Sequence, residues 1–185
     1  IPLILRDFGL DKEVFSILNI SSKHNSDSLL NFKNWEDFTD KIKNSNKQIT
    51  VGIVGKYTNV HDSYLSILKS IEHAAPYFGA AVKIKWIEAT DIEDGKIKVE
   101  DALKDVEGVI VPGGFGKRGI EGKIAAIKYV RENNIPYLGL CYGMQMAVVE
   151  FARDVCGLKT AQSTEIDPGT DCPIIDIIPE QKEKI

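Results

Sequence analysis

From Gln48 onward, apolar residues recur with two different periods along the chain. Residues 49–54 form a mostly apolar, β-favouring run, which predicts a buried strand. After it, apolar residues return at spacings of four, three, four and three, the spacing of one helical face. These residues are Tyr64, Leu68, Ile71, Ala75 and Phe78, and Asp62 stands where a helix cap is expected.

The alternation of strands and helices continues to the end of the chain. Further strands are predicted at 82–86, 109–111, 137–140 and 173–178. Further helices are predicted at 99–103, at 120–130 and directly behind Cys141. We therefore expect an α/β fold with a largely parallel central sheet and helices on both faces. In such a fold, ligands bind beyond the carboxyl ends of the strands.

The first 47 residues follow a different pattern. Residues 1–20 contain an amphipathic stretch, 21–28 are all polar and predict a linker, and 44–47 are a second polar break. A short helix with one apolar face is predicted from the spacing of Phe32, Trp35, Phe38 and Ile42. We expect that face to pack on a neighbouring domain, and we place a domain boundary at residue 47. Because the chain starts without methionine inside an apolar run, we expect it to be a piece of a longer polypeptide.

Composition and charge restrict the class of protein. Of 185 residues, 43% are hydrophobic, and the net charge is -4 without a basic stripe, which argues against nucleic acid as the main partner. Cys141, Cys156 and Cys172 have no CxxC spacing and the histidines do not cluster, so we expect no metal site. Sparse cysteines, no membrane-length apolar run and no signal peptide predict a soluble cytoplasmic protein.

The strand predicted at 137–140 leads directly into a cysteine between two glycines. Gly139, Cys141 and Gly143 form Gly-x-Cys-x-Gly, the cysteine form of the sharp strand-to-helix turn that presents a nucleophile. The positive end of the following helix would favour the thiolate of Cys141. The alternative is a small buried apolar cysteine without chemistry, and these residues alone leave both interpretations open.

A second glycine-rich turn follows the strand predicted at 109–111. Gly113, Gly114 and Gly116 let backbone amides face an anion at close range, although phosphate binding or a simple turn would fit these residues as well. If this turn lies opposite Cys141, the amides of Gly114 and Tyr142 could jointly hold a tetrahedral oxyanion. A nucleophile with two such donors is the machinery of acyl transfer.

The stretch 139–145, Gly-Leu-Cys-Tyr-Gly-Met-Gln, resembles the nucleophile motif of class I glutamine amidotransferases. The resemblance implies the flavodoxin-like architecture of that family and a glutaminase in which Cys141 attacks the side-chain amide of glutamine. It implies that glutamine and the oxyanion are bound by Gly114, Tyr142, Gly143, Met144, Gln145 and Glu165. Glu165 would face the ammonium group of glutamine. Without the resemblance, Gln145 is an ordinary helix residue and Glu165 a solvated carboxylate.

Residues 111–123 are similar to the oxyanion loop of the family members that aminate UTP to CTP. Residues 54–57, 134–139 and 163–165 resemble the same members, and 1–11 look like the end of their synthetase domain. The resemblance implies that 1–47 are the end of a synthetase domain and an interdomain linker. Residues 48–185 would be an amidotransferase domain that is incomplete at its C-terminus.

This resemblance also implies partners outside the segment. Ammonia would pass to the synthetase domain of the same polypeptide, which uses ATP and magnesium, in a full-length homo-tetramer. GTP would activate the glutaminase, with Lys117 and Arg118 as candidate contacts. No cofactor is implied for the segment itself, and no nucleic acid or membrane partner.

The chain departs from the family pattern in two places. The family has a His-x-Glu pair downstream of the cysteine, whereas no histidine follows His73 here, so we expect the chain to be inactive alone. His61 and His73 are interpreted as surface or helix residues, and Cys156 and Cys172 as structural. Tyr142 stands where leucine is usual.

Two alternatives to the glutaminase hypothesis are considered. One is another cysteine hydrolase of the same fold, such as a relative of γ-glutamyl hydrolases. The other is a non-catalytic binding or assembly module that has lost its catalytic triad. The resemblance of residues 111–123 disfavours the first, and a His-x-Glu pair in any continuation of the sequence would count against the second.

Overall fold

The computed structural model describes residues 2–20 and 26–178, with the side chains of 26–31 left out. Two compact units are present: 1–47 together with 72–81, and 48–71 together with 82–185. The roles predicted for 1–47 and 48–185 stay predictions. In the predicted linker, residues 21–25, which include His24, lie outside the described residues. Residues 26–28 begin a helix.

The second unit is built on a four-stranded sheet. Its strands are β1 (Lys47–Gly55), β2 (Ala80–Glu88), β3 (Gly108–Val111) and β4 (Tyr137–Gly139), in the order β2-β1-β3-β4. β3 pairs in parallel with both β1 and β4, through Ile53 opposite Ile110 and Ile110 opposite Leu138. Because the chain goes from β1 outward to β2 and then returns to the other side of β1, the carboxyl ends of β1 and β3 flank a topological switch point. The predicted α/β class and parallel sheet are confirmed.

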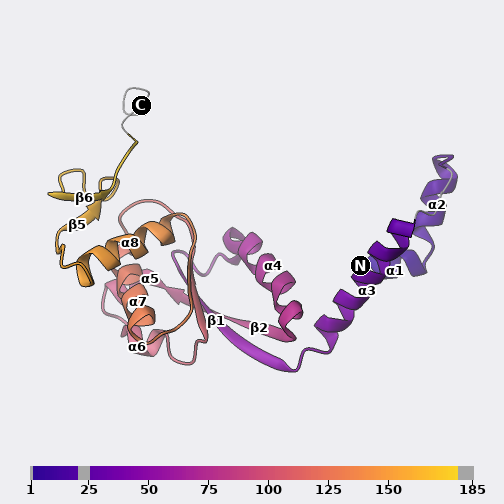
Figure 1. Cartoon of the computed structure of the whole chain (residues 1–185), viewed down its shortest axis with the longest axis horizontal. Helices are drawn as coiled ribbons and strands as arrows, with labels where there is room; N and C mark the ends of the chain where they lie inside the picture. Colours follow the sequence, from indigo (N-terminus) through magenta and orange to yellow (C-terminus); the bar gives the residue numbers. More distant parts are fainter. Residues whose placement is uncertain (1, 21–25, 179–185) are drawn as a thin grey trace. The chain divides into compact units, whose positions relative to one another are not determined.

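Helices follow the strands where the apolar spacing predicts them. The short helices α5 (Ala89–Glu93) and α6 (Val99–Ala102) come after β2, and only α6 was predicted. The longer helices α7 (Ile120–Glu132) and α8 (Tyr142–Asp154) lie side by side (Figure 1). The core between helices and sheet contains Val54, Ile87, Val109, Val111, Ile120, Ile124, Ile127, Val130, Met146 and Val149.

The helix predicted at 64–78 is divided into three pieces. These are the 3-10 turn η1 (His61–Tyr64), α4 (Leu65–Ala74) and the 3-10 turn η2 (Ala75–Phe78). Pro76 has no N–H to donate, so the α-helical hydrogen bonds stop before it. The prediction that Asp62 caps the helix is wrong, because Asp62 lies inside η1 and no side chain caps that turn.

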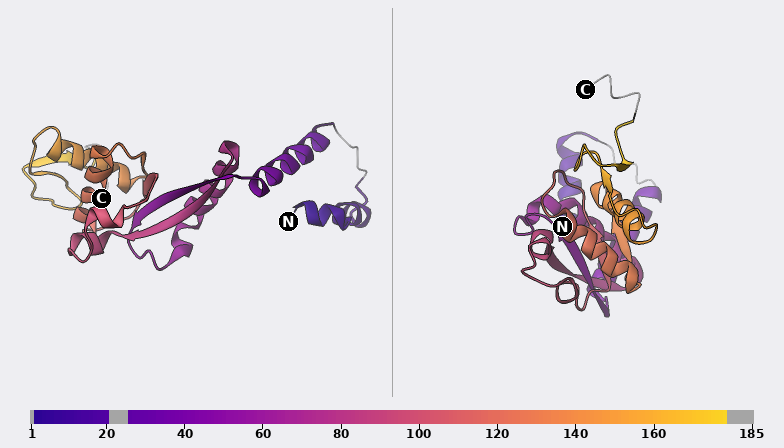
Figure 2. Two further views of the ribbon diagram at one scale, coloured as in Figure 1. Left: turned by 90° about the horizontal axis from the view of Figure 1, so that it is seen from below. Right: turned by 90° about the vertical axis from the view of Figure 1, so that its left-hand side faces the viewer.

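A small second sheet lies against α8 (Figure 2). It consists of β5 (Ala161–Ser163) and β6 (Cys172–Ile175), which pair in parallel. The strand predicted at 173–178 ends early, because Asp176 Oδ1 accepts hydrogen bonds from the hydroxyl of Thr164 and the N–H of Ile177. That N–H is thereby removed from the strand pairing.

The first unit contains α1 (Pro2–Asp7), α2 (Leu10–Ile17), α3 (Ser26–Lys43) and η2. The predicted apolar stripe is part of α3, where Phe38 contacts the rings of Trp35, His73 and Tyr77. α1 and α2 bury no residue, and Phe8 and Ile17 are largely exposed. In the part of the chain that the structure describes, no helix combines the length and the apolar character needed to span a membrane.

An ion pair joins α7 to α8. The Arg131 guanidinium donates from Nε at 3.0 Å and from a terminal nitrogen at 2.7 Å to Oε1 of Glu150, whose side chain is 1% exposed. Arg131→Met should lower the free energy of unfolding by about 2–4 kcal/mol, because it leaves a buried carboxylate without its partner. Urea unfolding measures this change.

Lys128→Met is the matched control, because it removes the more exposed pair that Lys128 forms with Asp154. It should cost less than about 1 kcal/mol. Equal losses in the two variants would contradict a special role for the buried pair.

Candidate active site

Cys141 occupies a sharp turn between β4 and α8. Its backbone has φ 50° and ψ −102°, a conformation that residues with a side chain rarely adopt. The residue is exposed. The strand–turn–helix arrangement predicted around Cys141 is therefore present, and its role as the nucleophile remains a prediction.

The two glycines beside Cys141 allow the close approach of backbone segments. A Cβ on Gly143 would lie 2.0 Å from the carbonyl oxygen of Val111, and one on Gly139 would lie 2.6 Å from the nitrogen of Met144. Any side chain at either position would collide with main chain. The glycines thus let α8 begin directly against β3 and β4.

The glycine-rich turn lies next to Cys141. The N–H of Leu140 donates to the carbonyl of Val111 at 2.9 Å, which continues the pairing of β3 and β4 up to the turn. A Cβ on Gly113 would be 3.6 Å from the Cβ of Cys141. The two segments that the sequence singled out separately are therefore neighbours at the carboxyl edge of the sheet.

Three side chains hold the 113–116 turn at Gly116. Lys56 Nζ, after β1, donates to the carbonyl of Phe115 at 2.8 Å and to that of Gly116 at 3.3 Å. The hydroxyl of Tyr142 donates to the same Gly116 carbonyl at 3.0 Å. The N–H of Gly116 donates to Oε1 of Glu165 at 3.3 Å. The turn is thereby bound to residues that follow β1, β4 and β5.

A buried lysine lies beneath this turn. Lys123 is 1% exposed, and its Nζ is 5.2 Å from the ring centroid of Tyr142. Burial lowers the pKa of Lys123 from 10.5 to about 8, helped by the charge of Lys56 and opposed by that of Glu88. Burial, with a contribution from Glu165, raises the pKa of Tyr142 to about 12. The tyrosine hydroxyl therefore keeps its proton and acts as a donor at neutral pH.

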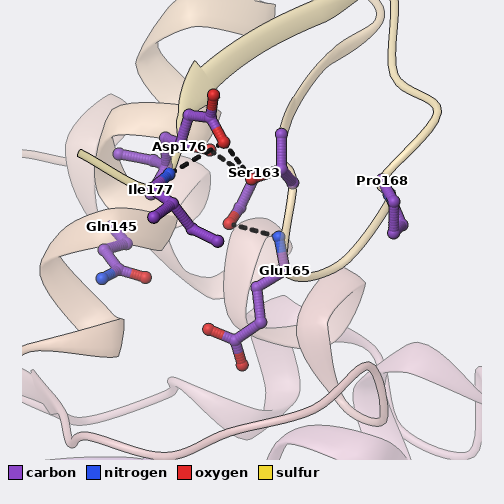
Figure 3. A pocket seen from close by; sticks show the side chains of 8 residues that line it. Gln145, Ser163, Glu165, Pro168, Asp176 and Ile177 are labelled. Carbon is purple, nitrogen blue, oxygen red and sulfur yellow. Dashed lines mark hydrogen bonds between the residues drawn. The ribbon is translucent and has the colours of Figure 1, made fainter. Parts of the chain in front are cut away.

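A pocket of about 730 Å³ lies between the start of α8 and the small sheet. Among the described residues, its lining is Gln145, Ser163, Thr164, Glu165, Pro168, Ile175, Asp176 and Ile177. Gln145 and Glu165 face the same open space from α8 and from the segment after β5 (Figure 3). The Oε1 atom of Gln145 is buried without a hydrogen-bond partner, so this site holds an unsatisfied acceptor. Cys141 and Gly114 are not among the described residues that line the pocket.

The other predicted site residues have different surroundings. Gly143 is buried, and its N–H donates to the carbonyl of Leu140. The side chain of Met144 lines a separate apolar groove together with Ala147, Val148, Phe151, Ala152, Cys156 and Ile174. Arg118 lies over the ring of Tyr57 at 5.9 Å. The structure thus brings Gly114, Tyr142 and Glu165 to one turn, whereas the side chain of Met144 points elsewhere.

Neither described histidine belongs to this site. The ring of His61 stacks on Trp86 at 4.5 Å, and that of His73 is edge-on to Phe38 at 6.1 Å. Within residues 2–20 and 26–178, Cys141 therefore has no histidine as a hydrogen-bond partner.

Sequence reasoning missed two residues that support the turn, Lys56 and Lys123. A lysine in the first turn of a helix ordinarily indicates a solvated surface. Besides its place at the end of the resembling stretch 111–123, the signal for Lys123 was its position in an apolar row with Ile120 and Ile127, where a core side chain is expected. Lys56 gave no signal beyond its position at the end of a strand and inside the resembling stretch 54–57.

The buried ammonium predicts an unusual dependence of stability on pH. The folded pKa of Lys123 is about 8 and the unfolded value is 10.5, so between these values the unfolded chain binds more protons. Stability should therefore rise with pH across that window. Lys123→Met should be more stable than the parent chain at pH 7 by on the order of 1–3 kcal/mol, and the difference should shrink by about pH 9.

Urea unfolding at both pH values measures this difference. Lys128→Met, which changes a more exposed lysine, should show no such pH-dependent gain. A Lys123→Met gain that stays constant with pH would contradict the buried charge.

Comparison with known proteins gives one consistent result. A family model described as "Glutamine amidotransferase class-I" matches residues 59–182. The chain is 49% identical over 185 residues to a CTP synthase of Sulfurisphaera tokodaii, which is 100% of this chain and 34% of that protein. It is 48% identical over 183 residues to a CTP synthase of Bacillus subtilis, which is 99% of this chain and 33% of that protein. The chain thus spans about a third of the length of the curated relatives it matches.

A solved structure is also similar to this chain. It is described as "Trypanosoma brucei CTPS - glutaminase domain with bound acivicin", with a TM-score of 0.66 and 34% identity. The match covers 72% of this chain and 52% of that one. Together with the cysteine turn and the glycine-rich turn that face each other across the sheet edge, these matches show that the chain belongs to the class I glutamine amidotransferase family.

Proposed function

We propose that this chain is the glutamine-hydrolysing part of a CTP synthase. The observation that carries the proposal is the exposed Cys141, held in a strained turn directly against the 113–116 turn. A strained backbone at an exposed cysteine is retained only where the surrounding structure enforces it, and such positions cluster at active sites.

The proposed reaction is hydrolysis of the side-chain amide of glutamine. The thiolate of Cys141 attacks the amide carbon, and the N–H groups of Gly114 and Tyr142 stabilise the negative charge on the tetrahedral oxygen. The proton removed from the Cys141 thiol passes to the leaving nitrogen, and the carbon–nitrogen bond breaks. Ammonia is released and a γ-glutamyl thioester remains. Water then cleaves the thioester to glutamate and restores the thiol.

Glutamine would be bound by its amino-acid end in the pocket next to α8. Glu165 supplies a carboxylate for the ammonium group, and Gln145 supplies the unsatisfied Oε1. We assign Gly143 and Met144 to the same site through their backbone. The proton acceptor for Cys141 would be the His-x-Glu pair of the family, from outside residues 1–185, because the three histidines here are His24, His61 and His73.

The rest of the proposal concerns the whole protein. The similar CTP synthases are about three times as long as this chain. We propose that residues 1–47 end a synthetase domain that uses ATP and magnesium to aminate UTP with the released ammonia. GTP would activate the glutaminase through the region of Lys117 and Arg118, in a homo-tetramer. A cytoplasmic, reducing environment would keep Cys141 as a thiol.

A chloroketone analogue of glutamine tests the proposed nucleophile. Because the analogue carries the amino-acid group that the proposed site would bind, Cys141 should be alkylated at least about tenfold faster than exposed Cys156, a preference of about 1.4 kcal/mol. Peptide mapping by mass spectrometry locates and times the adducts. Cys141→Ala should lose the fast adduct and keep the slow one.

Iodoacetamide, which carries no glutamine group, is the control reagent and should not show the same preference. Equal rates at Cys141 and Cys156 with the chloroketone would refute the assignment. That result would favour the non-catalytic module.

The role of Glu165 is tested by Glu165→Gln. The side-chain amide oxygen of the new residue at 165 can still accept a hydrogen bond from the N–H of Gly116. The variant therefore removes the charge and keeps this contact to the turn. The chloroketone concentration at which Cys141 is labelled at half its maximal rate should rise about tenfold. The reason is that the ion pair between Glu165 and the ammonium group of the reagent is lost. The maximal rate should change little.

Glu100→Gln, on the exposed surface of α6, is the matched control and should leave both quantities unchanged. An unaltered half-maximal concentration in Glu165→Gln would exclude Glu165 as the ammonium partner.

A further inference from the structure

Tyr142, the residue after Cys141, contacts the 113–116 turn through its side chain. We propose that the side-chain hydroxyl of Tyr142 is a positioning group, which holds the 113–116 turn at a fixed distance from the start of α8. The inference rests on the proposed function, because its purpose is to set the spacing of the two oxyanion donors. Tyr142 would supply one donor through its own N–H and fix the place of the other, that of Gly114, through its hydroxyl.

The contacts of Tyr142 carry this inference. Its hydroxyl donates to the carbonyl of Gly116 at 3.0 Å, and its side chain is 1% exposed. The Nζ of Lys123 lies 5.2 Å from the ring centroid, at a distance typical of a cation–π contact. The ring is therefore fixed on α8 and the hydroxyl fixes the turn, so the turn cannot shift relative to α8 without breaking this hydrogen bond.

The residues of the turn themselves restrict its backbone little. It contains three glycines within four residues, and glycine has more backbone freedom than any other residue. Phe115, the one large side chain in the turn, is 81% exposed and so anchors nothing in the core. Gly116 has φ 74°, in the left-handed region that favours glycine. The hydroxyl of Tyr142 binds the carbonyl of this same residue.

Lys56 and Glu165 also bind Gly116, but neither can set the same distance. Lys56 belongs to the end of β1, and Glu165 lies beyond β5. Tyr142 is the one of the three that also carries a proposed oxyanion donor. A leucine at this place would have no hydroxyl, so it could not form the hydrogen bond to Gly116.

The test compares Tyr142→Phe with the parent chain, since phenylalanine keeps the ring and removes only the hydroxyl. Hydrogen exchange of the amides of residues 113–117 should become about 3–10-fold faster, which is the effect of losing one of several hydrogen bonds. Exchange in β3 and in the second half of α8 should stay as it was. Tyr142→Leu should show the same local change, which keeps the test available if one variant folds poorly.

Labelling of Cys141 gives a second readout. A chloroketone needs the oxyanion donors when its carbonyl is attacked, whereas iodoacetamide does not. Tyr142→Phe should therefore slow chloroketone labelling about 3–10-fold and leave iodoacetamide labelling unchanged. Tyr129→Phe, which removes a hydroxyl from α7 away from the turn, is the matched control and should change neither rate.

The outcomes separate this inference from the proposed function. Unchanged exchange in the turn, or faster exchange throughout the chain, would overturn the positioning role. Equal slowing of both reagents would also overturn it, because that result indicates a general disturbance of Cys141. Absence of chloroketone labelling at Cys141 in the complete polypeptide, which would include the proposed proton acceptor, would refute the proposed function. The exchange measurement would still decide whether the hydroxyl holds the turn.

Discussion

The parallel pairing of β3 with β4 is the constraint on which the site depends. The two strands are in register up to Val111 and Gly139, and the hydrogen bond from Leu140 to Val111 extends the pairing by one residue. The segment after each strand therefore leaves the sheet at the same level. This is why a turn from one strand and a cysteine from the next meet, although they are 28 positions apart in the sequence (113 and 141). The glycine at 143 then allows α8 to start against the same carbonyl of Val111.

Beneath this edge, Lys123 and Tyr142 take buried places that apolar side chains ordinarily fill. Lys56, Lys123, Tyr142 and Glu165 surround one short turn, and the ammonium of Lys123 is sealed from water. Burying such groups lowers the stability of the domain unless hydrogen bonds and opposite charges compensate. Their contacts therefore fix the shape of the turn at a cost to the stability of the fold.

The sequence predicted the parts of this structure that depend on local periodicity. The strands and the two long helices followed from apolar spacing, and the cysteine turn followed from two glycines at fixed positions. The missed elements, α5 and β5, are too short to show a period, and Pro76 divided a helix whose apolar spacing continued past it. Lys123 could not be assigned from sequence, because its burial results from the packing of α7 against the sheet edge rather than from its neighbours in the chain. The prediction of Asp62 as a cap failed because a 3-10 turn begins before it.

One helical turn at the start of α8 holds Cys141, Tyr142 and Gln145. These three residues are fixed to one another by the helix backbone, so a rigid shift of α8 would move the thiol, one amide donor and one pocket residue together. Such a shift would change the distance between these three residues and Gly114. Under the proposed function, control of glutamine hydrolysis from a distant part of the polypeptide would therefore need to alter a single separation, between one helix end and one glycine-rich turn.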